Sequence, residues 1–197
     1  MTVCDRLREN DKWRNIAKAA VVDVISPEEL DAWLVGRPRL EAIVHMGAIS
    51  STTVIDADLT FDVNVRLSTR LWEWCAMHAT PFIYASSAAT YGAGEQGFDD
   101  ADDFESLLRL RPLNAYGWSK CFFDRRVANC IAHDHPAPPQ WVGLKFFNVY
   151  GPNEYHKGSM QSVVAQKFPL LASGAPITLF TSHDSRYRDG EQLRDFI

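Results

Sequence analysis

Residues 81–92, PFIYASSAATYG, hold the pattern that decides the fold. An apolar run, PFIYAS, is followed at once by small, hydroxyl-bearing and glycine residues. The same order recurs in AIVHMGAISSTT (42–53) and in WVGLKFFNVYGPN (141–153). Helix-like segments at about 59–78 and 116–133 separate these runs, and short apolar runs of this kind are typical of buried strands. The alternation predicts βαβ units that form a parallel sheet.

The polar clusters after the three runs also predict where a ligand would bind. In a doubly wound sheet, ligands lie beside the carboxyl ends of the strands. A plain strand exit needs one turn residue, whereas each of these clusters has several small or hydroxyl-bearing residues. We therefore expect the three strand ends to share one cleft.

A glycine motif in the same region has a different meaning. GAGEQG (92–97) fits the G-x-G-x-x-G pattern of dinucleotide-binding turns. Such a turn must lead into an apolar helix whose positive N-terminus faces the pyrophosphate. Here FDDADD (98–103) follows instead and brings four carboxylates to that place. We predict that residues 98–105 and the proline-rich residues 133–140 are surface loops, and no other glycine spacing in the chain fits a phosphate-binding turn.

Composition narrows the class of protein. The 197 residues are 46% hydrophobic and 23% charged, which is typical of a globular domain. A net charge of −5 without a basic run argues against nucleic acid as a partner. The charged first residues and the lack of a long apolar run predict a cytoplasmic protein that does not enter a membrane. Because the four cysteines and six histidines lack metal-ligand spacing, we expect neither disulfides nor a metal site.

The candidate catalytic pair is Tyr116 and Lys120. Four residues apart on a helix, the phenol and the ammonium group lie on one face about a turn apart. A phenol accepts or releases a proton near neutral pH most readily beside a positive charge. Asn114 and Ser119 extend the pair to N-x-Y-x-x-S-K, and Ser87 ends the preceding predicted strand.

With these residues the chain resembles the extended short-chain dehydrogenase/reductases, the nucleotide-sugar epimerases and dehydratases. The resemblance rests on HMGAISSTT, PFIYASSAATYG, PLNAYGWSK, FFNVYGPNEYHKGSM and LRDFI. It is strongest to the branch that epimerises ADP-heptose at C6 for lipopolysaccharide synthesis. The resemblance implies a Rossmann-like, doubly wound parallel α/β sheet. It also implies a partial NADP-binding domain at residues 1–150 and the beginning of a small substrate domain at 151–197.

The resemblance assigns four catalytic residues. Tyr116 would be one acid/base, oriented by Lys120, and Ser87 would bond the reacting oxygen of the sugar. Lys157 would be a second acid/base on the opposite face of the sugar, although a solvated loop lysine is the alternative. Two such groups suit an epimerase, which removes hydride from C6 and returns it to the other face.

Binding residues follow from the same resemblance, with NADP as cofactor, NAD as the alternative, and ADP-heptose as substrate. Arg6 would pair with a 2′-phosphate, although a surface arginine is an equal alternative. The cofactor-binding set is Asp5, Arg6, Lys12, Met46, Gly47, Ala48, Ile49, Ser50, Asn64, Lys120 and Val149. The substrate-binding set is Ser87, Asn148, Ser159, Gln166, Phe180 and Arg194.

The chain also departs from the family pattern. The family has a first strand with its glycine-rich turn ahead of the segment that matches residue 1, and its substrate domain continues beyond the segment that matches residue 197. We therefore expect an internal fragment of an enzyme that is a homo-oligomer at full length, with an exposed sheet edge where the strand is missing. Two alternatives stay open: another nucleotide-sugar epimerase or dehydratase, and a non-catalytic fragment. Ala88, Ala89 and Thr90 disfavour a dehydratase, which usually has acidic residues there.

Overall fold

The computed structural model describes residues 1–8, 11–36, 39–182, 184–193 and 196. The chain forms two compact units. One consists of residues 28–146, and the other combines residues 1–27 with 147–197. Each unit is described on its own below.

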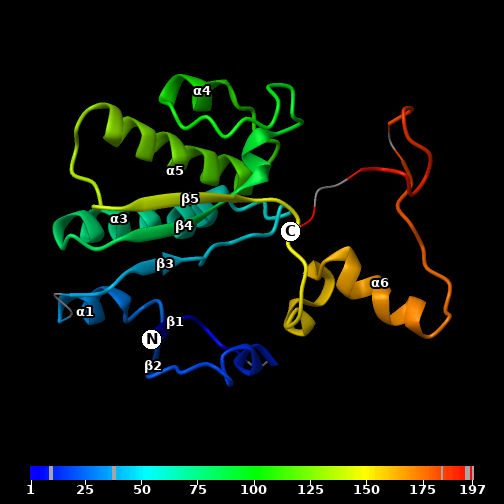
Figure 1. The fold of residues 1–197 in the computed structure, drawn as a ribbon, viewed down its shortest axis with the longest axis horizontal. Coiled ribbons are helices and arrows are strands. Elements are labelled where there is room, and N and C mark those ends of the chain that lie inside the picture. The colour runs from blue at the N-terminus through cyan, green and yellow to red at the C-terminus, as the bar shows by residue number, and fades with distance from the viewer. Residues whose placement is uncertain (9–10, 37–38, 183, 194–195, 197) are drawn as a thin grey trace. The chain divides into compact units, whose positions relative to one another are not determined.

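The unit of residues 28–146 is built on a three-stranded parallel sheet (Figure 1). Its strands are β3 (Ile43–His45), β4 (Phe82–Ser87) and β5 (Trp141–Phe146), with β4 in the centre. The register pairs His45 with Tyr84 and Tyr84 with Gly143, so these three residues lie on one face. The prediction of a parallel sheet from the three apolar runs is confirmed.

Helical segments connect these strands as the sequence predicts. Between β3 and β4, α2 (Ala57–Phe61), the π-helical turn η2 (Asp62–Arg66) and α3 (Leu67–Met77) follow one another without a break. Between β4 and β5 lie η3 (Ala88–Tyr91), α4 (Phe104–Arg109) and the long helix α5 (Ala115–Ala132). The short helix α1 (Leu30–Val35) precedes β3. The predicted helices at 59–78 and 116–133 are therefore confirmed, with boundaries shifted by one or two residues.

Aromatic packing places α3 and α5 on the same face of the sheet. Trp72 of α3 has its ring centroid 6.2 Å from that of Phe82 and 5.6 Å from that of Trp141. Phe123 of α5 meets Tyr84 edge to face at 4.9 Å. Phe82 and Tyr84 are two residues apart on β4 and so point to one face, which both helices cover. This face is the hydrophobic core of the unit.

The glycine motif lies between η3 and α4. Gly92, Gly94 and Gly97 all have positive φ angles, of 64°, 78° and 77°, as in a turn. Helix α4 starts only at Phe104, where the Asp103 carboxylate accepts a hydrogen bond from Ser106 N at 2.8 Å. Gly97 therefore does not lead into a helix, as the interpretation of this motif as a plain turn requires. The predicted loop at 98–105 is wrong in its last two residues, because helix α4, which Asp103 caps, begins at Phe104.

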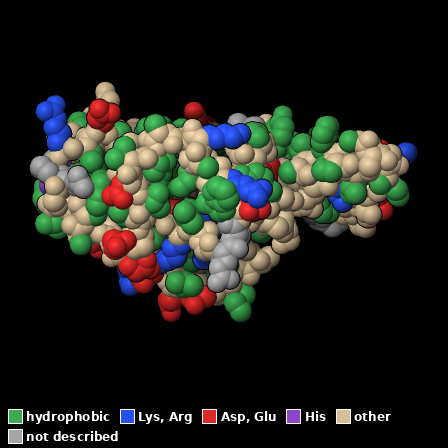
Figure 2. Space-filling model, turned by 90° about the horizontal axis from the view of Figure 1, so that it is seen from below, with side chains coloured by type: hydrophobic (Ala, Val, Ile, Leu, Met, Phe, Trp, Pro, Cys, Tyr) green, Lys and Arg blue, Asp and Glu red, His purple; other side chains and the backbone are tan. Residues whose placement is uncertain are grey.

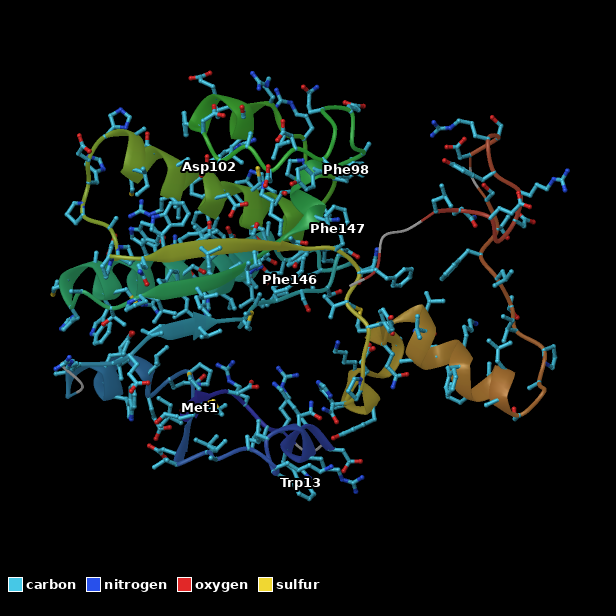
Figure 3. All side chains as sticks on the ribbon, in the orientation of Figure 1. Met1, Trp13, Phe98, Asp102, Phe146 and Phe147 are labelled. Atoms are coloured by element: carbon cyan, nitrogen blue, oxygen red, sulfur yellow. The ribbon has the colours of Figure 1, made fainter. Side chains whose placement is uncertain are left out.

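The first residue of the acidic segment, Phe98, contacts the glycine turn; Figure 3 labels Phe98 and Asp102. The Phe98 ring packs edge to face on Tyr91, with 5.4 Å between centroids. A Cβ atom on Gly94 would lie 2.8 Å from the Phe98 ring, and the φ angle of 78° is one that favours glycine. The Asp99 and Asp100 carboxylates of the segment contribute to a raised pKa of Tyr91, after the burial of its ring.

The second unit contains a two-stranded parallel sheet, β1 (Thr2–Cys4) with β2 (Asp23–Ile25). Its helical segments are η1 (Asp11–Asn15), η4 (Tyr155–Met160) and α6 (Val163–Ala172). The side chains of Asn15 and His156 hydrogen-bond at 3.2 Å, which joins η1 to η4 across 141 residues of sequence. Phe147, the first residue of the returning chain, directly follows β5 (Figure 3).

Surface properties of the described residues are ordinary. Acidic and basic side chains are interspersed among apolar ones on the face shown in Figure 2. Among the residues described, no helix is both long and apolar enough to cross a membrane. The same residues contain no group of three or more histidine, cysteine or acidic side chains placed to hold a metal ion. All four cysteines are present as thiols, and Cys75, Cys121 and Cys130 are buried.

Candidate functional site

Ser87 lies at the carboxyl end of β4, as the sequence predicts. Its hydroxyl oxygen accepts a hydrogen bond from Ala89 N at 3.1 Å and so caps the η3 turn. Only 8% of the residue is exposed. Because this bond uses a lone pair of the oxygen, the hydroxyl hydrogen is still available to a ligand.

Tyr116 lies in the first turn of α5, against the η3 turn. The Asn114 side chain caps this helix by accepting a hydrogen bond from Gly117 N at 2.8 Å. A Cβ atom on Gly117 would lie 2.6 Å from Ala89 O, so the helix backbone packs directly on η3. This close approach joins the turn that carries Tyr116 to the turn that follows Ser87.

Lys120 is buried on the same face of α5, and only 4% of it is exposed. Its ammonium group donates a hydrogen bond to Ala85 O of β4 at 2.8 Å. Burial lowers the pKa of Lys120 to about 8, while the nearby Asp124 carboxylate acts in the opposite direction. The ammonium group is thus held in place at the strand that ends in Ser87.

His45, at the end of β3, is buried and uncharged near neutral pH. Burial, with a smaller effect of Lys120, lowers the pKa of His45 to about 4. Its Nε2 atom lies 2.9 Å from the Ser68 hydroxyl, whose single hydrogen is donated to Asn64 O at 2.7 Å. His45 must therefore donate from Nε2, which fixes the tautomer of the ring.

Asn64 holds the loop that follows β3. Its Oδ1 accepts from Ile49 N at 2.8 Å, and its Nδ2 donates to Ile49 O at 3.0 Å and to the Ser119 hydroxyl at 2.9 Å. The residue is 1% exposed and lies in the π-helical turn η2. Both amide hydrogens are thus used within the protein, so Asn64 positions the cofactor-binding loop predicted at Met46–Ser50 relative to α5.

The Met46–Ser50 loop is open enough for a cofactor to contact its backbone. At Gly47 a Cβ atom would meet only the His45 ring, at an ordinary 3.7 Å, so internal packing does not require glycine there. Met46 is 48% exposed, and Gly47 and Ser50 are also exposed. Hydroxyl, phenol and ammonium groups beside an open strand-end loop fit the ribose and nicotinamide part of a dinucleotide.

Asp5, Arg6 and Lys12 come together in the other unit, after strand β1. The Lys12 ammonium group lies 2.6 Å from both carboxylate oxygens of Asp5 and 3.4 Å from Arg6 O. Arg6 N donates to Asp5 Oδ1 at 2.7 Å. A carboxylate paired with a lysine and followed in sequence by an arginine fits a ribose that carries a phosphate.

Lys157 lies in η4, and its side chain is 40% exposed. Its ammonium group is 3.7 Å from the Glu154 carboxylate. Glu154 is 6% exposed and accepts hydrogen bonds from Ser162 N at 2.7 Å, Ser162 Oγ at 2.8 Å and Gly151 N at 3.1 Å. Glu154 thereby fixes both ends of the loop that carries Lys157. The second catalytic role of Lys157 stays a prediction.

The remaining predicted binding residues belong to the same unit. Val149, Ser159, Gln166 and Phe180 are exposed, and Asn148 forms an isolated parallel bridge with Phe196. The Gln166 amide donates to Gln161 O at 2.7 Å. Arg194 lies outside the described residues. Their proposed contacts with cofactor or substrate stay predictions.

Two charged residues of the same unit, the buried Asp124 and the half-buried Lys145, were missed from the sequence. Asp124 is 6% exposed and accepts a hydrogen bond from Ser86, and Lys145 of β5 lies 3.7 Å from it. The spacing of Lys120 and Asp124 could have revealed the first, because residues four apart share a helix face. Lys145 gave no such local signal, since it lies 21 residues further along the chain, on another element.

Known proteins match this chain over its whole length. The model of the NAD dependent epimerase/dehydratase family matches residues 1–197. The chain is 46% identical to the ADP-L-glycero-D-manno-heptose-6-epimerase of Fusobacterium nucleatum, over 99% of this chain and 58% of that protein. It is 43% identical to the enzyme of that name from Nitratidesulfovibrio vulgaris, over 100% of this chain and 60% of that protein. The chain thus spans about three fifths of these curated relatives.

Solved structures show the same fold. The ADP-L-glycero-D-manno-heptose-6-epimerase of Helicobacter pylori has a TM-score of 0.76 and 28% identity, over 100% of this chain and 59% of that one. The UDP-glucose 4-epimerase of Thermus thermophilus, solved with NAD, has a TM-score of 0.65. At 24% identity, over 100% of this chain and 61% of that one, the second likeness concerns the fold alone.

Proposed function

Because this chain belongs to the NAD dependent epimerase/dehydratase family, we propose that it carries the catalytic part of an ADP-L-glycero-D-manno-heptose 6-epimerase. The observation on which this proposal mainly rests is the arrangement of Ser87, Tyr116 and Lys120. Lys120 hydrogen-bonds to β4, the strand that ends at Ser87. The names of relatives at 43–46% identity support the choice of sugar. The proposed substrate and product are the two C6 epimers of ADP-glycero-manno-heptose, and their use in lipopolysaccharide synthesis is part of the proposal.

In the proposed reaction, C6 of the heptose is oxidised to a ketone and then reduced from its other face. The Tyr116 side chain, in its phenolate form, takes the hydroxyl proton during oxidation, and the Ser87 hydroxyl donates a hydrogen bond to the same oxygen. The Lys120 ammonium group favours the ionised phenol through its positive charge. A nicotinamide cofactor, when bound, supplies the acceptor and donor of the hydride.

Reduction from the other face needs a second acid/base, and Lys157 is proposed for this role. Glu154 holds the loop that carries Lys157, so the ammonium group extends from a fixed segment of backbone. A reductase that works on one face needs only one such group. Lys157 is therefore the residue that distinguishes an epimerase from a simple reductase here.

NADP is the proposed cofactor in preference to NAD. The pairing of Asp5 with Lys12, beside Arg6, supports this choice because cationic side chains suit a 2′-phosphate. The other parts of the proposal are a division near residue 150 into cofactor and substrate domains, a cytoplasmic location, and a homo-oligomer for the longer protein.

The test combines binding with turnover. Calorimetry on this chain should detect NADP⁺ and show weaker binding of NAD⁺. Conversion of ADP-D-glycero-D-manno-heptose should then be followed by NMR of the C6 proton, with UDP-glucose as the competing substrate. If the chain turns over UDP-glucose but not the ADP-heptose, the proposed substrate is wrong. If it neither binds the cofactor nor turns over either sugar, a non-catalytic fragment is favoured.

Variants separate the two acid/base groups. Tyr116→Phe should abolish epimerisation, and Lys157→Ala should block it while NADP⁺ still binds. Tyr187→Phe and Lys167→Ala are matched controls that remove the same groups elsewhere. Full activity in both Tyr116→Phe and Lys157→Ala would contradict the mechanism.

A further inference from the structure

A buried carboxylate lies one helical turn beyond Lys120. Asp124 follows Lys120 by four residues on α5, so the two side chains share a face of the helix. Its Oδ2 accepts a hydrogen bond from Ser86 Oγ at 2.6 Å, and its Oδ1 accepts one from Tyr84 OH at 3.1 Å. The reaction described above does not use this residue.

These contacts tie α5 to β4 at three consecutive strand residues. Asp124 holds the side chains of Tyr84 and Ser86, and Lys120 holds the carbonyl of Ala85 between them. The next residue of the strand is Ser87, and Tyr116 lies in the first turn of the same helix. The network therefore sets the register between the strand and the helix that carry the proposed catalytic groups.

The carboxylate also lies between two cationic side chains. The Lys145 ammonium group of β5 is 3.7 Å from Asp124 Oδ2 and 4.8 Å from the centre of the Tyr91 ring. Burial raises the pKa of Asp124, whereas the hydrogen bonds from Ser86 and Tyr84 and the charges of Lys145 and Lys120 oppose that rise. One negative charge thus faces two positive charges in a site with little solvent.

Other titratable groups adjoin this network from neighbouring elements. His45 of β3 faces Lys120 but is neutral, because its pKa is lowered to about 4. Tyr84 is also influenced by Asp102 of the acidic segment, and Tyr91 by Asp99 and Asp100. Asp124 is therefore the carboxylate that acts on Lys120 from within its own helix.

We propose that Asp124 is a positioning residue of this site, which acts through Lys120 by fixing its register on β4 and by balancing its charge. The proposal rests on the proposed function for its catalytic meaning. Its physical content concerns Lys120 alone and is measurable without turnover.

The experiment follows the titration of Lys120 by NMR, in the 197-residue chain with ¹³C-labelled lysine. The Lys120 signal is assigned from its absence in Lys120→Met, and its midpoint should lie near pH 8. Asp124→Asn keeps the size of the side chain but removes the charge. It should lower the midpoint by about one pH unit, since loss of a nearby anion disfavours the ammonium form. Asp124→Glu, which restores the charge, should return the midpoint toward that of the wild type.

Ser86→Ala is the structural control. It removes a hydrogen bond from the same network but keeps the carboxylate, so it should lower stability and leave the Lys120 midpoint in place. An unmoved midpoint in Asp124→Asn, or an equal shift in Ser86→Ala, would overturn the proposal. If Asp124→Asn does not fold, Asp124→Ser removes the same charge with a smaller side chain and should likewise lower the midpoint. No change there would equally overturn the proposal.

Turnover adds an independent readout. The alkaline limb of the kcat profile should move to lower pH in Asp124→Asn by the same amount as the NMR midpoint. A wild-type chain that titrates as expected but does not epimerise ADP-heptose would contradict the proposed function and leave the role of Asp124 supported.

Discussion

Replacement of Lys120 by methionine should stabilise the protein at neutral pH while it removes a proposed catalytic group. Burial lowers the pKa of Lys120 from 10.5 to about 8. A difference of about 2.5 pH units corresponds to about 3 kcal/mol of unfolding free energy. Loss of the hydrogen bond to Ala85 O should cost about 1–2 kcal/mol. Lys120→Met should therefore be more stable than the wild type by about 1–2 kcal/mol at pH 7.

The lowered pKa of Lys120 also determines how the stability difference between Lys120→Met and the wild type changes with pH. Below pH 8 the lysine is charged in both states, and the folded state bears the full penalty of a buried charge. Between pH 8 and 10.5 the unfolded chain binds more protons than the folded one, so the wild type gains stability as the pH rises. The advantage of Lys120→Met should therefore shrink over this range and be lost by about pH 10.5.

Urea unfolding monitored by tryptophan fluorescence at pH 7 and pH 10 measures both effects. Lys167→Met is the control, and its difference from the wild type should be the same at both pH values. The reasoning is refuted if Lys120→Met is less stable than the wild type at pH 7, or if its difference from the wild type does not change with pH.

Three further predictions concern the same unit and its surroundings. Gly117→Ala should lower stability by about 1–3 kcal/mol, because the new Cβ would lie 2.6 Å from a backbone oxygen, whereas Gly151→Ala, with no neighbour within 4 Å, should be silent in urea unfolding. Gly47→Ala should weaken NADP⁺ binding about tenfold in calorimetry with little loss of stability, and equal binding would argue against a cofactor contact there. His45→Gln should reduce acid sensitivity: because the pKa of His45 is lowered to about 4, the wild type should lose about 3 kcal/mol of stability between pH 6.5 and pH 4, and a variant with the same acid profile would contradict this.

The sequence predicted those features that depend on neighbouring residues. Apolar runs followed by polar clusters gave the strands and the positions where they end, and the acidic residues after Gly97 excluded a dinucleotide-binding turn. The four-residue spacing placed Tyr116 and Lys120 on one face of α5. Each of these signals acts over one helical turn or one strand, where backbone geometry alone decides which side chains share a face.

Tertiary structure decided what those residues do. Lys120 is buried and bonded to Ala85, 35 residues away, and the Asn64 amide hydrogen-bonds to Ile49 and Ser119. The loop predicted through residue 105 gave way to a helix capped by Asp103. The sequence pattern indicated which residue types lie at the strand ends. Which of them are buried, charged or used as partners depends on contacts between distant elements, because burial and dielectric environment are properties of the packed core.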